Sequence, residues 1–229
     1  DPEQVQTIKA HPRKISAIAF LPDGSGFLTA SFDGSVVQWD MRSGAPQASA
    51  SFQHDDRVVA MDLGEDGVTL VTAAGPEDAE AVLRAWDRTN PDRPLHTAPL
   101  AALRDGVASK DPATSRGNRS GASSRGRGGI NKNDPLVRAL AIHPEEARAL
   151  ITIFDPTTST YRIKSWSWTD GNHRLQPAST TWLRDVSTAL YAKHRPGAML
   201  TVGGRGARVQ TLAGRASRVT MTYRPQSSI

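Results

Sequence analysis

The 229-residue sequence contains no cysteine. This absence excludes disulfide frameworks, zinc-finger spacings, iron–sulfur ligation and thiol catalysis, so packing and hydrogen bonds must hold the fold. The sequence also lacks the apolar run of roughly 18 residues that a membrane-spanning helix needs. Its first residues, DPEQVQTIKA, have neither the basic nor the apolar region of a secretory signal. We expect a cytoplasmic protein.

Charge is unevenly distributed along the chain, although the formal net charge is only +5. Residues 1–97 carry a net charge of −7, and residues 98–133 carry +5. Residues 134–185 are neutral, whereas residues 186–229 carry +7 and contain no acidic side chain. The charges of the separate segments are more informative about possible binding partners than the net charge of the whole chain.

Short β-rich runs separated by tight turns begin at Lys14. The turns are Pro22-Asp23-Gly24, Asp33-Gly34 and Ser43-Gly44, with only a few residues between them. This pattern predicts a four-stranded antiparallel meander. One meander cannot bury its apolar faces alone, so further copies are expected.

Copies of the meander recur along the chain. Its first strand is echoed at three later positions, giving ISAIAFLPDG (15–24), VVAMDLGEDG (58–67), VRALAIHPEE (137–146) and VSTALYAKHR (186–195). The first two starts lie 43 residues apart, and Ile229 lies 43 residues beyond the fourth start. The longest spacing contains the low-complexity stretch 98–133. A period near 43 residues with one insertion accounts for the pattern.

The pairs Trp39-Asp40 and Trp86-Asp87 close the third strand of the first two units. With this period, the chain resembles the WD40-repeat β-propeller family. The resemblance implies an all-β fold of four-stranded antiparallel blades. We expect blades at approximately 10–52, 53–97, 134–182 and 183–223, and a disordered insertion at 98–133.

The number of visible blades implies that the ring is incomplete. The family's propellers usually have about seven blades, and four are visible here. We therefore expect the chain to be a segment of a larger propeller, completed by further sequence, by a second chain or by self-association. Strand 4–9 would belong to a preceding or closing blade. A closed four-bladed ring is the alternative.

The resemblance also implies a structural hydrogen-bond tetrad in the first blade, formed by His11, Ser31, Asp33 and Trp39. In the second unit His54 and Trp86 remain, while Ala74 takes the serine position, and in the third unit Ile153 takes it. His11, Ser31 and Asp33 are also the residue types of a hydrolase triad. Because the tetrad ends on an indole inside the blade, we expect a structural role, with no catalytic residue, no cofactor and no metal site.

Family resemblance further implies a scaffold that binds a protein or peptide through loops at one face of the propeller, as part of a larger multidomain protein or complex. The candidate partner-binding residues are Lys14, Ser16, Phe32 and Arg57. Phe32, beside the Asp33-Gly34 turn, need not serve the core and is suited to anchoring a peptide. Packing of Phe32 onto the neighbouring loop is the alternative.

A nucleic-acid-associated module is the second hypothesis. The insertion carries Arg116, Arg119, Arg125 and Arg127, which would bind RNA or an acidic partner through salt-sensitive contacts. Arg208 and Arg218 lie in or beside predicted strands of one blade and would add a basic patch. No aromatic residue is interleaved in the insertion, so base stacking is not offered there, and a purely solvated loop remains an alternative.

Overall fold

Four antiparallel sheets make up the protein, which we describe from a computed structural model. The structure describes residues 7–75, 81–100, 136–155, 160–169, 176–177, 188–192, 195–203, 206–211 and 218–223. In these ranges each sheet has four strands, and no helix is long and apolar enough to cross a membrane. The predicted all-β fold of four-stranded blades is confirmed.

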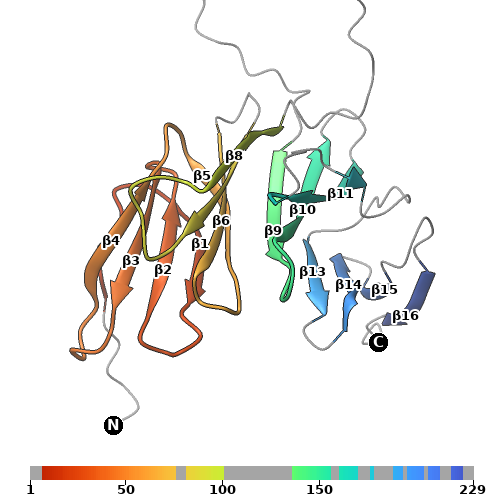
Figure 1. Cartoon of the computed structure of the whole chain (residues 1–229), viewed down its shortest axis with the longest axis horizontal. Helices are drawn as coiled ribbons and strands as arrows, with labels where there is room; N and C mark the ends of the chain where they lie inside the picture. Colours follow the sequence, from red (N-terminus) through yellow and green to blue (C-terminus); the bar gives the residue numbers. More distant parts are fainter. Residues whose placement is uncertain are drawn as a thin grey trace, which may run out of the picture.

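Each blade is a meander whose strands pair in chain order (Figure 1). Blade 1 comprises β1 (Ile15–Phe20), β2 (Gly26–Ser31), β3 (Ser35–Asp40) and β4 (Gln47–Gln53). Blade 2 comprises β5 (Val58–Leu63), β6 (Thr69–Ala74), β7 (Val82–Asp87) and β8 (His96–Pro99). Blade 3 comprises β9 (Leu136–Ile142), β10 (Arg148–Asp155), β11 (Thr160–Ser167) and β12 (Gln176–Pro177). Blade 4 comprises β13 (Thr188–Ala192), β14 (Arg195–Gly203), β15 (Gly206–Thr211) and β16 (Arg218–Tyr223).

The turn between β2 and β3 shows how local sequence builds the meander. Gly34 has a φ of 90°, a conformation that residues with a Cβ rarely adopt. Asp33 accepts a hydrogen bond of 2.9 Å from the backbone N–H of Ser35. The Gly34 carbonyl then accepts a 2.8 Å hydrogen bond from the His54 N–H. This turn therefore joins blade 1 to the start of blade 2.

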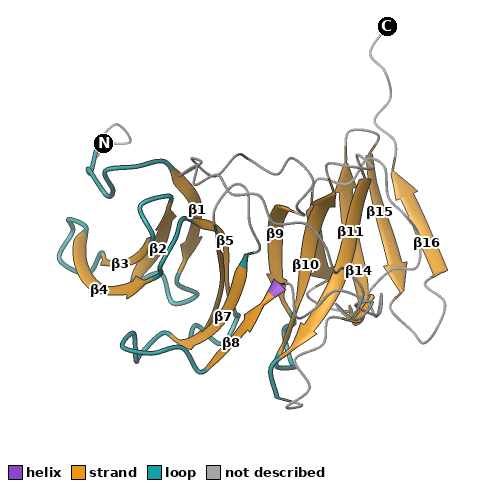
Figure 2. Cartoon of the chain, turned by 90° about the horizontal axis from the view of Figure 1, so that it is seen from above, coloured by secondary structure: helices purple, strands orange, loops and turns teal. Residues whose placement is uncertain are grey.

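The blades follow one another across the molecule in chain order (Figure 2). Their first strands are neighbours: β5 lies against both β1 and β9, and β9 also lies against β13. Because a blade presents two apolar faces, each internal blade is covered on both sides by its neighbours. Blade 1 is covered by described residues only on the side of blade 2.

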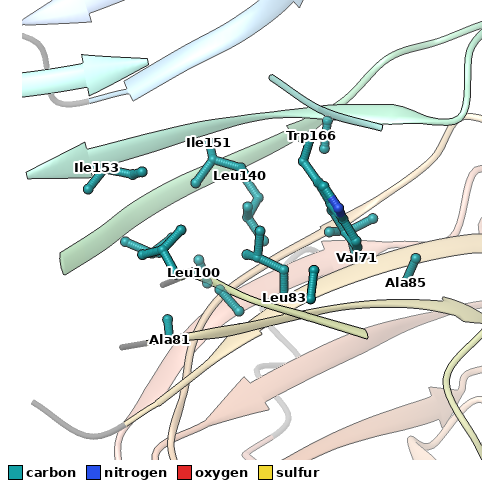
Figure 3. Packing of buried hydrophobic residues seen from close by; sticks show 14 of the residues in the cluster. Val71, Ala81, Leu83, Ala85, Leu100, Leu140, Ile151, Ile153 and Trp166 are labelled. Carbon is teal, nitrogen blue, oxygen red and sulfur yellow. The ribbon is translucent and has the colours of Figure 1, made fainter. Parts of the chain in front are cut away.

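The hydrophobic core is divided among the blade interfaces. Between blades 1 and 2, the Phe52 ring packs edge-on against Trp86 with centroids 5.5 Å apart. Between blades 2 and 3, Leu83 packs with Ile151 and Trp166, all three nearly inaccessible to solvent (Figure 3). A smaller cluster joins blades 3 and 4. Stability therefore depends mainly on packing between blades rather than within one sheet.

Two predicted boundaries need correction. The insertion was expected to start at residue 98, but Ala98 lies in β8 and Leu100 follows it, with 1% and 6% exposure. Both are apolar and pack into the core between blades 2 and 3, so blade 2 extends to Leu100. The rest of the insertion, residues 101–133, lies outside the described residues. Residues 7–9, the described part of predicted strand 4–9, are not in a strand.

Candidate functional site

The first blade contains a continuous chain of side-chain hydrogen bonds. His11 Nδ1 lies 2.8 Å from Asp33 Oδ2, and His11 Nε2 lies 2.7 Å from Thr29 Oγ1. Trp39 Nε1 donates to the same Thr29 oxygen at 2.9 Å. Because an indole can only donate, the Thr29 hydroxyl hydrogen is free for His11 Nε2, and His11 Nδ1–H then donates to Asp33.

Asp33 remains a carboxylate in this arrangement. Burial by itself would raise its pKa, but hydrogen bonds from the Ser35 hydroxyl and N–H and from His11 outweigh burial and lower the pKa. The Asp33 carboxylate thus accepts hydrogen bonds from the turn residue Ser35 and from His11. Asp33 is therefore not available to orient a base toward a substrate.

Thr29, rather than Ser31, joins the histidine to the tryptophan. The Ser31 hydroxyl instead accepts from the Asp33 N–H at 3.1 Å and donates to the Arg13 carbonyl at 3.4 Å. The sequence-based assignment of Ser31 to the tetrad is therefore wrong by two residues. Thr29 and Ser31 share one face of β2, so the period-two pattern of a strand did not separate them.

Shifting the assigned position by the same two residues in blade 2 gives Thr72, which has a hydroxyl. Thr72 Oγ1 lies 2.9 Å from His54 Nε2 and accepts from Trp86 Nε1 at 2.9 Å. Ala74, assigned to this position from sequence, lies two residues further along β6. His54 Nδ1 is buried and has no hydrogen-bond partner among the described residues. Burial, aided by the nearby Arg84 charge, lowers the pKa of His54 to about 4, so its ring is neutral at pH 7.

The third blade has lost the hydroxyl. Trp166 pairs across the strands with Ala149 as Trp39 pairs with Phe27, which places Ile151 where Thr29 stands in blade 1. The sequence comparison assigned Ile153 here, again two residues too far along. Trp166 Nε1 is consequently buried with no hydrogen-bond partner among the described residues, amid the apolar side chains of Figure 3.

In blade 1 this arrangement satisfies the polar side-chain atoms of His11, Thr29 and Trp39 and encloses them. The His11 side chain is 1% exposed, and Thr29 is 2% exposed. A nucleophilic hydroxyl must be reachable by substrate, and the Thr29 hydroxyl is enclosed between a histidine and an indole. Within the described ranges, no group of three or more metal-ligating side chains gathers.

Three of the four predicted partner-binding residues meet at one place. Lys14 Nζ and Arg57 Cζ each lie 5.3 Å from the centroid of the Phe32 ring, within cation–π range. The Phe32 N–H donates to the Lys14 carbonyl at 2.9 Å, which fixes the two loops together. We refer to Lys14, Phe32 and Arg57 as the Phe32 platform. The Phe32 ring is half-buried. It packs against side chains of the neighbouring loops, and part of it remains exposed to solvent.

Ser16, the fourth predicted residue, has a different position. Its hydroxyl donates a 2.6 Å hydrogen bond to the Val58 carbonyl, which links β1 to β5. The bond occupies the only donor of that side chain. Ser16 is therefore part of the junction between blades 1 and 2.

The loop that supplies Lys14 to the platform is basic. Lys9, Arg13 and Lys14, in the loop before β1, are exposed and form no ion pair with a described carboxylate. Two nearby acidic groups have partners outside the platform: Asp33 is bonded to His11, and Asp55 pairs with Arg84 at 2.6 Å. A third, Asp56, belongs to the platform's surroundings, because its Oδ1 lies 3.9 Å from Arg57 Nε. Exposed positive charge is thus concentrated in the loop before β1, while Asp56 offsets part of the charge of Arg57.

The basic residues of the nucleic-acid hypothesis are only partly described. Arg208 in β15 pairs in register with Thr222 of β16, and Arg218 in β16 pairs with Thr211 of β15. The two arginines therefore lie on adjacent strands of one blade, as predicted. Arg116, Arg119, Arg125 and Arg127 lie outside the described residues.

Sequence comparison finds relatives among repeat proteins. A family model described as "WD domain, G-beta repeat" matches residues 2–40. WD repeat-containing protein 1 of Rattus norvegicus is 30% identical over 98 residues, which cover 42% of this chain and 15% of that protein. The target of rapamycin complex subunit wat1 of Schizosaccharomyces pombe is 32% identical over 83 residues, covering 36% of this chain and 24% of that protein.

Structural comparison matches most of the chain. The structures titled U3-55K and RRP9 WD40 repeats are each 17% identical, with TM-scores of 0.56 and 0.55. Each covers 92% of this chain, which in turn covers 53% and 52% of those chains. A functionally unknown protein from Desulfotomaculum acetoxidans DSM 771 has a TM-score of 0.58 at 12% identity. The chain thus spans about half of these solved structures and at most 24% of the curated relatives named above.

Proposed function

We propose that this chain, a WD40-repeat protein with a propeller-type fold, is a non-catalytic scaffold that binds a protein or peptide at the Phe32 platform. WD40 repeats generally mediate protein–protein interactions in scaffolds, which supports the class of function. The observation that carries the proposal is the convergence of Lys14 and Arg57 on the ring of Phe32. An aromatic side chain flanked by cations is the type of group that dominates binding energy at protein interfaces.

Rigidity of the platform supports this role. Phe32 is held by its own N–H bond to Lys14, and the Gly34 carbonyl is held by His54. The platform therefore draws on the loops before β1 and β5 and on the turn after β2, all anchored in strands. Binding to a preorganised surface avoids most of the entropic cost of ordering loops.

The relatives of the chain also support a scaffold function. The wat1 protein is a subunit of a complex, and the U3-55K and RRP9 structures share the propeller-type fold. We propose by analogy that this chain also works within a larger protein or complex. Enclosure of the His11–Thr29–Trp39 hydrogen bonds within blade 1 supports a structural rather than catalytic role for them.

Peptide display tests the proposal. A random peptide library selected on the wild-type protein should yield binders whose affinity falls about tenfold or more on Phe32→Ala. Leu95→Ala removes an exposed apolar side chain, 59% accessible, from a different loop and is the matched control. Selected peptides should bind this control as they bind the wild type. Selection of no peptides, or of peptides indifferent to Phe32→Ala, would contradict the proposal.

A further inference from the structure

Blade 1 exposes apolar side chains on the face turned away from blade 2. Ile15, Ile18 and Phe20 of β1 are 40%, 57% and 76% exposed. Behind them the aromatic rings form a row, with Phe20 5.9 Å from Phe27 and Phe27 6.1 Å from Trp39. We call these five residues the Phe20 face. A soluble protein rarely leaves such a contiguous apolar surface uncovered.

The corresponding residues of blade 2 are covered. Strands β1 and β5 have the same pairing irregularity, between Ile15 and Ala17 in one and between Val58 and Ala60 in the other. By this register Val58 and Met61 match Ile15 and Ile18, yet they are only 0% and 8% exposed. The residue types are alike, so the difference arises from the neighbouring blade. Blade 1 lies over β5, and no described strand lies over β1 on this side.

The tryptophans of blades 1, 2 and 3 mark the same side of each of these blades. Trp86 packs edge-on against Phe52, which blade 1 supplies from its outer strand. Trp166 of blade 3 packs likewise into the core shared with blade 2. Blades 2 and 3 thus each bury the tryptophan face against the blade before them in the chain. Trp39 has the same position in blade 1 and lacks the equivalent of Phe52 among the described residues.

We infer that the Phe20 face is the docking surface for a further four-stranded blade of the same polypeptide. The geometry at blade 2 defines what that blade presents: small and branched apolar side chains like Leu28 and Val36, and an aromatic side chain from its outer strand like Phe52. Propellers that match 92% of this chain are nearly twice as long, which supports a source within one polypeptide. This inference does not depend on the Phe32 platform.

Thiol labelling tests the inference, because the described chain has no cysteine of its own. Single cysteines are placed at Ile18→Cys and, as a matched control, at Leu95→Cys in the natural polypeptide that carries these residues. The two side chains have nearly equal exposure here, 57% and 59%. Maleimide labelling rates are measured in the native protein and divided by the rates in urea. Circular dichroism confirms that each variant is folded.

We expect Ile18→Cys to react about tenfold or more slowly than Leu95→Cys, at every protein concentration, because only the first position is covered by the further blade. A second variant, Phe20→Cys, should be protected to a similar extent. Equal rates at positions 18 and 95 would overturn the inference. Protection that disappears on dilution would also overturn it, because that result assigns the face to a second copy of the chain.

Discussion

Trp39 donates its indole hydrogen to the hydroxyl of Thr29 across 2.9 Å, and the same hydroxyl lies 2.7 Å from His11 Nε2. One small side chain on β2 therefore connects the loop before β1 to strand β3. Blade 2 repeats this relationship through Thr72 and Trp86. Blade 3 has Ile151 in place of the threonine, so the Trp166 indole has no hydroxyl to which it can donate within the described part of the chain.

Replacing Thr29 with valine should destabilise the protein by about 1–3 kcal/mol, because two buried donor or acceptor groups lose their partner. The Ser31→Ala variant is the control. Its hydroxyl makes one long bond of 3.4 Å and one bond to a turn N–H, so we expect a cost of about 1 kcal/mol or less. Urea unfolding measures both. A larger cost for Ser31→Ala would return the bridging role to Ser31.

Restoring a hydroxyl to blade 3 should be tolerated better at one isoleucine than at the other. Ile151→Thr places an acceptor where Trp166 Nε1 needs one, whereas Ile153→Thr introduces the same polar group two residues away. Both isoleucines are at most 5% exposed. We expect Ile151→Thr to cost less than Ile153→Thr by about 1 kcal/mol in urea unfolding. Equal costs would show that Trp166 does not use the new oxygen.

Stability should fall as the pH drops from about 6.5 toward 4, in part because of His54. Burial and Arg84 lower the pKa of His54 to about 4 in the folded protein, from 6.5 for an unperturbed histidine. Within this window the unfolded chain binds the proton and the folded protein does not, so acid favours unfolding. The contribution of His54 to stability is complete above the upper pKa. Between pH 7 and pH 5 we expect a loss of about 2 kcal/mol from this residue.

A His54→Gln variant separates this effect from the other titrating groups. Its unfolding free energy should change less between pH 7 and pH 5 than that of the wild type, although the variant is less stable at pH 7. Urea unfolding at the two pH values provides the comparison. The same pH dependence in both proteins would mean that His54 is not protected from protonation in the folded state.

Glycine at position 34 should be far harder to replace than glycine at position 44. Both have positive φ angles, of 90° and 83°. A Cβ on Gly34 would lie 3.0 Å from the His54 carbonyl oxygen, whereas one on Gly44 would meet nothing within 4 Å. Gly44→Ala should cost about 1 kcal/mol from backbone strain alone, and Gly34→Ala about 2–3 kcal/mol. Thermal unfolding ranks the two, and equal costs would argue against a tight junction between blades 1 and 2 at this turn.

The sequence predicted the blades well because repeats and turns are local properties. The glycine turn at Gly34 and the closing Trp39-Asp40 pair identify strands that pair with their chain neighbours. A period near 43 residues then predicts that four such meanders stack side by side. The end of blade 2 was misplaced because Ala98 and Leu100 look like the start of a low-complexity stretch. Only their packing against blade 3 shows that they belong to the core.

The candidate site was predicted in part. Lys14, Phe32 and Arg57 were selected as loop residues, and the structure brings them into contact. Ser16 was selected by the same reasoning, but its hydroxyl is bonded to Val58. A loop position in the sequence does not show in which direction a side chain points. That direction determines whether each of these residues belongs to the Phe32 platform.

The sequence by itself determined the repeat, the order of the strands and the places of the turns, because these depend on hydrophobic alternation and on backbone preferences of nearby residues. Tertiary structure alone decided which hydroxyl bridges histidine to tryptophan, since Thr29 and Ser31 share a face of β2 but the Trp39 indole donates to Thr29. It also decided that Ile18 is exposed while Met61 is buried. The two residues lie at the same place in the repeat, and their burial depends on whether a neighbouring blade is present.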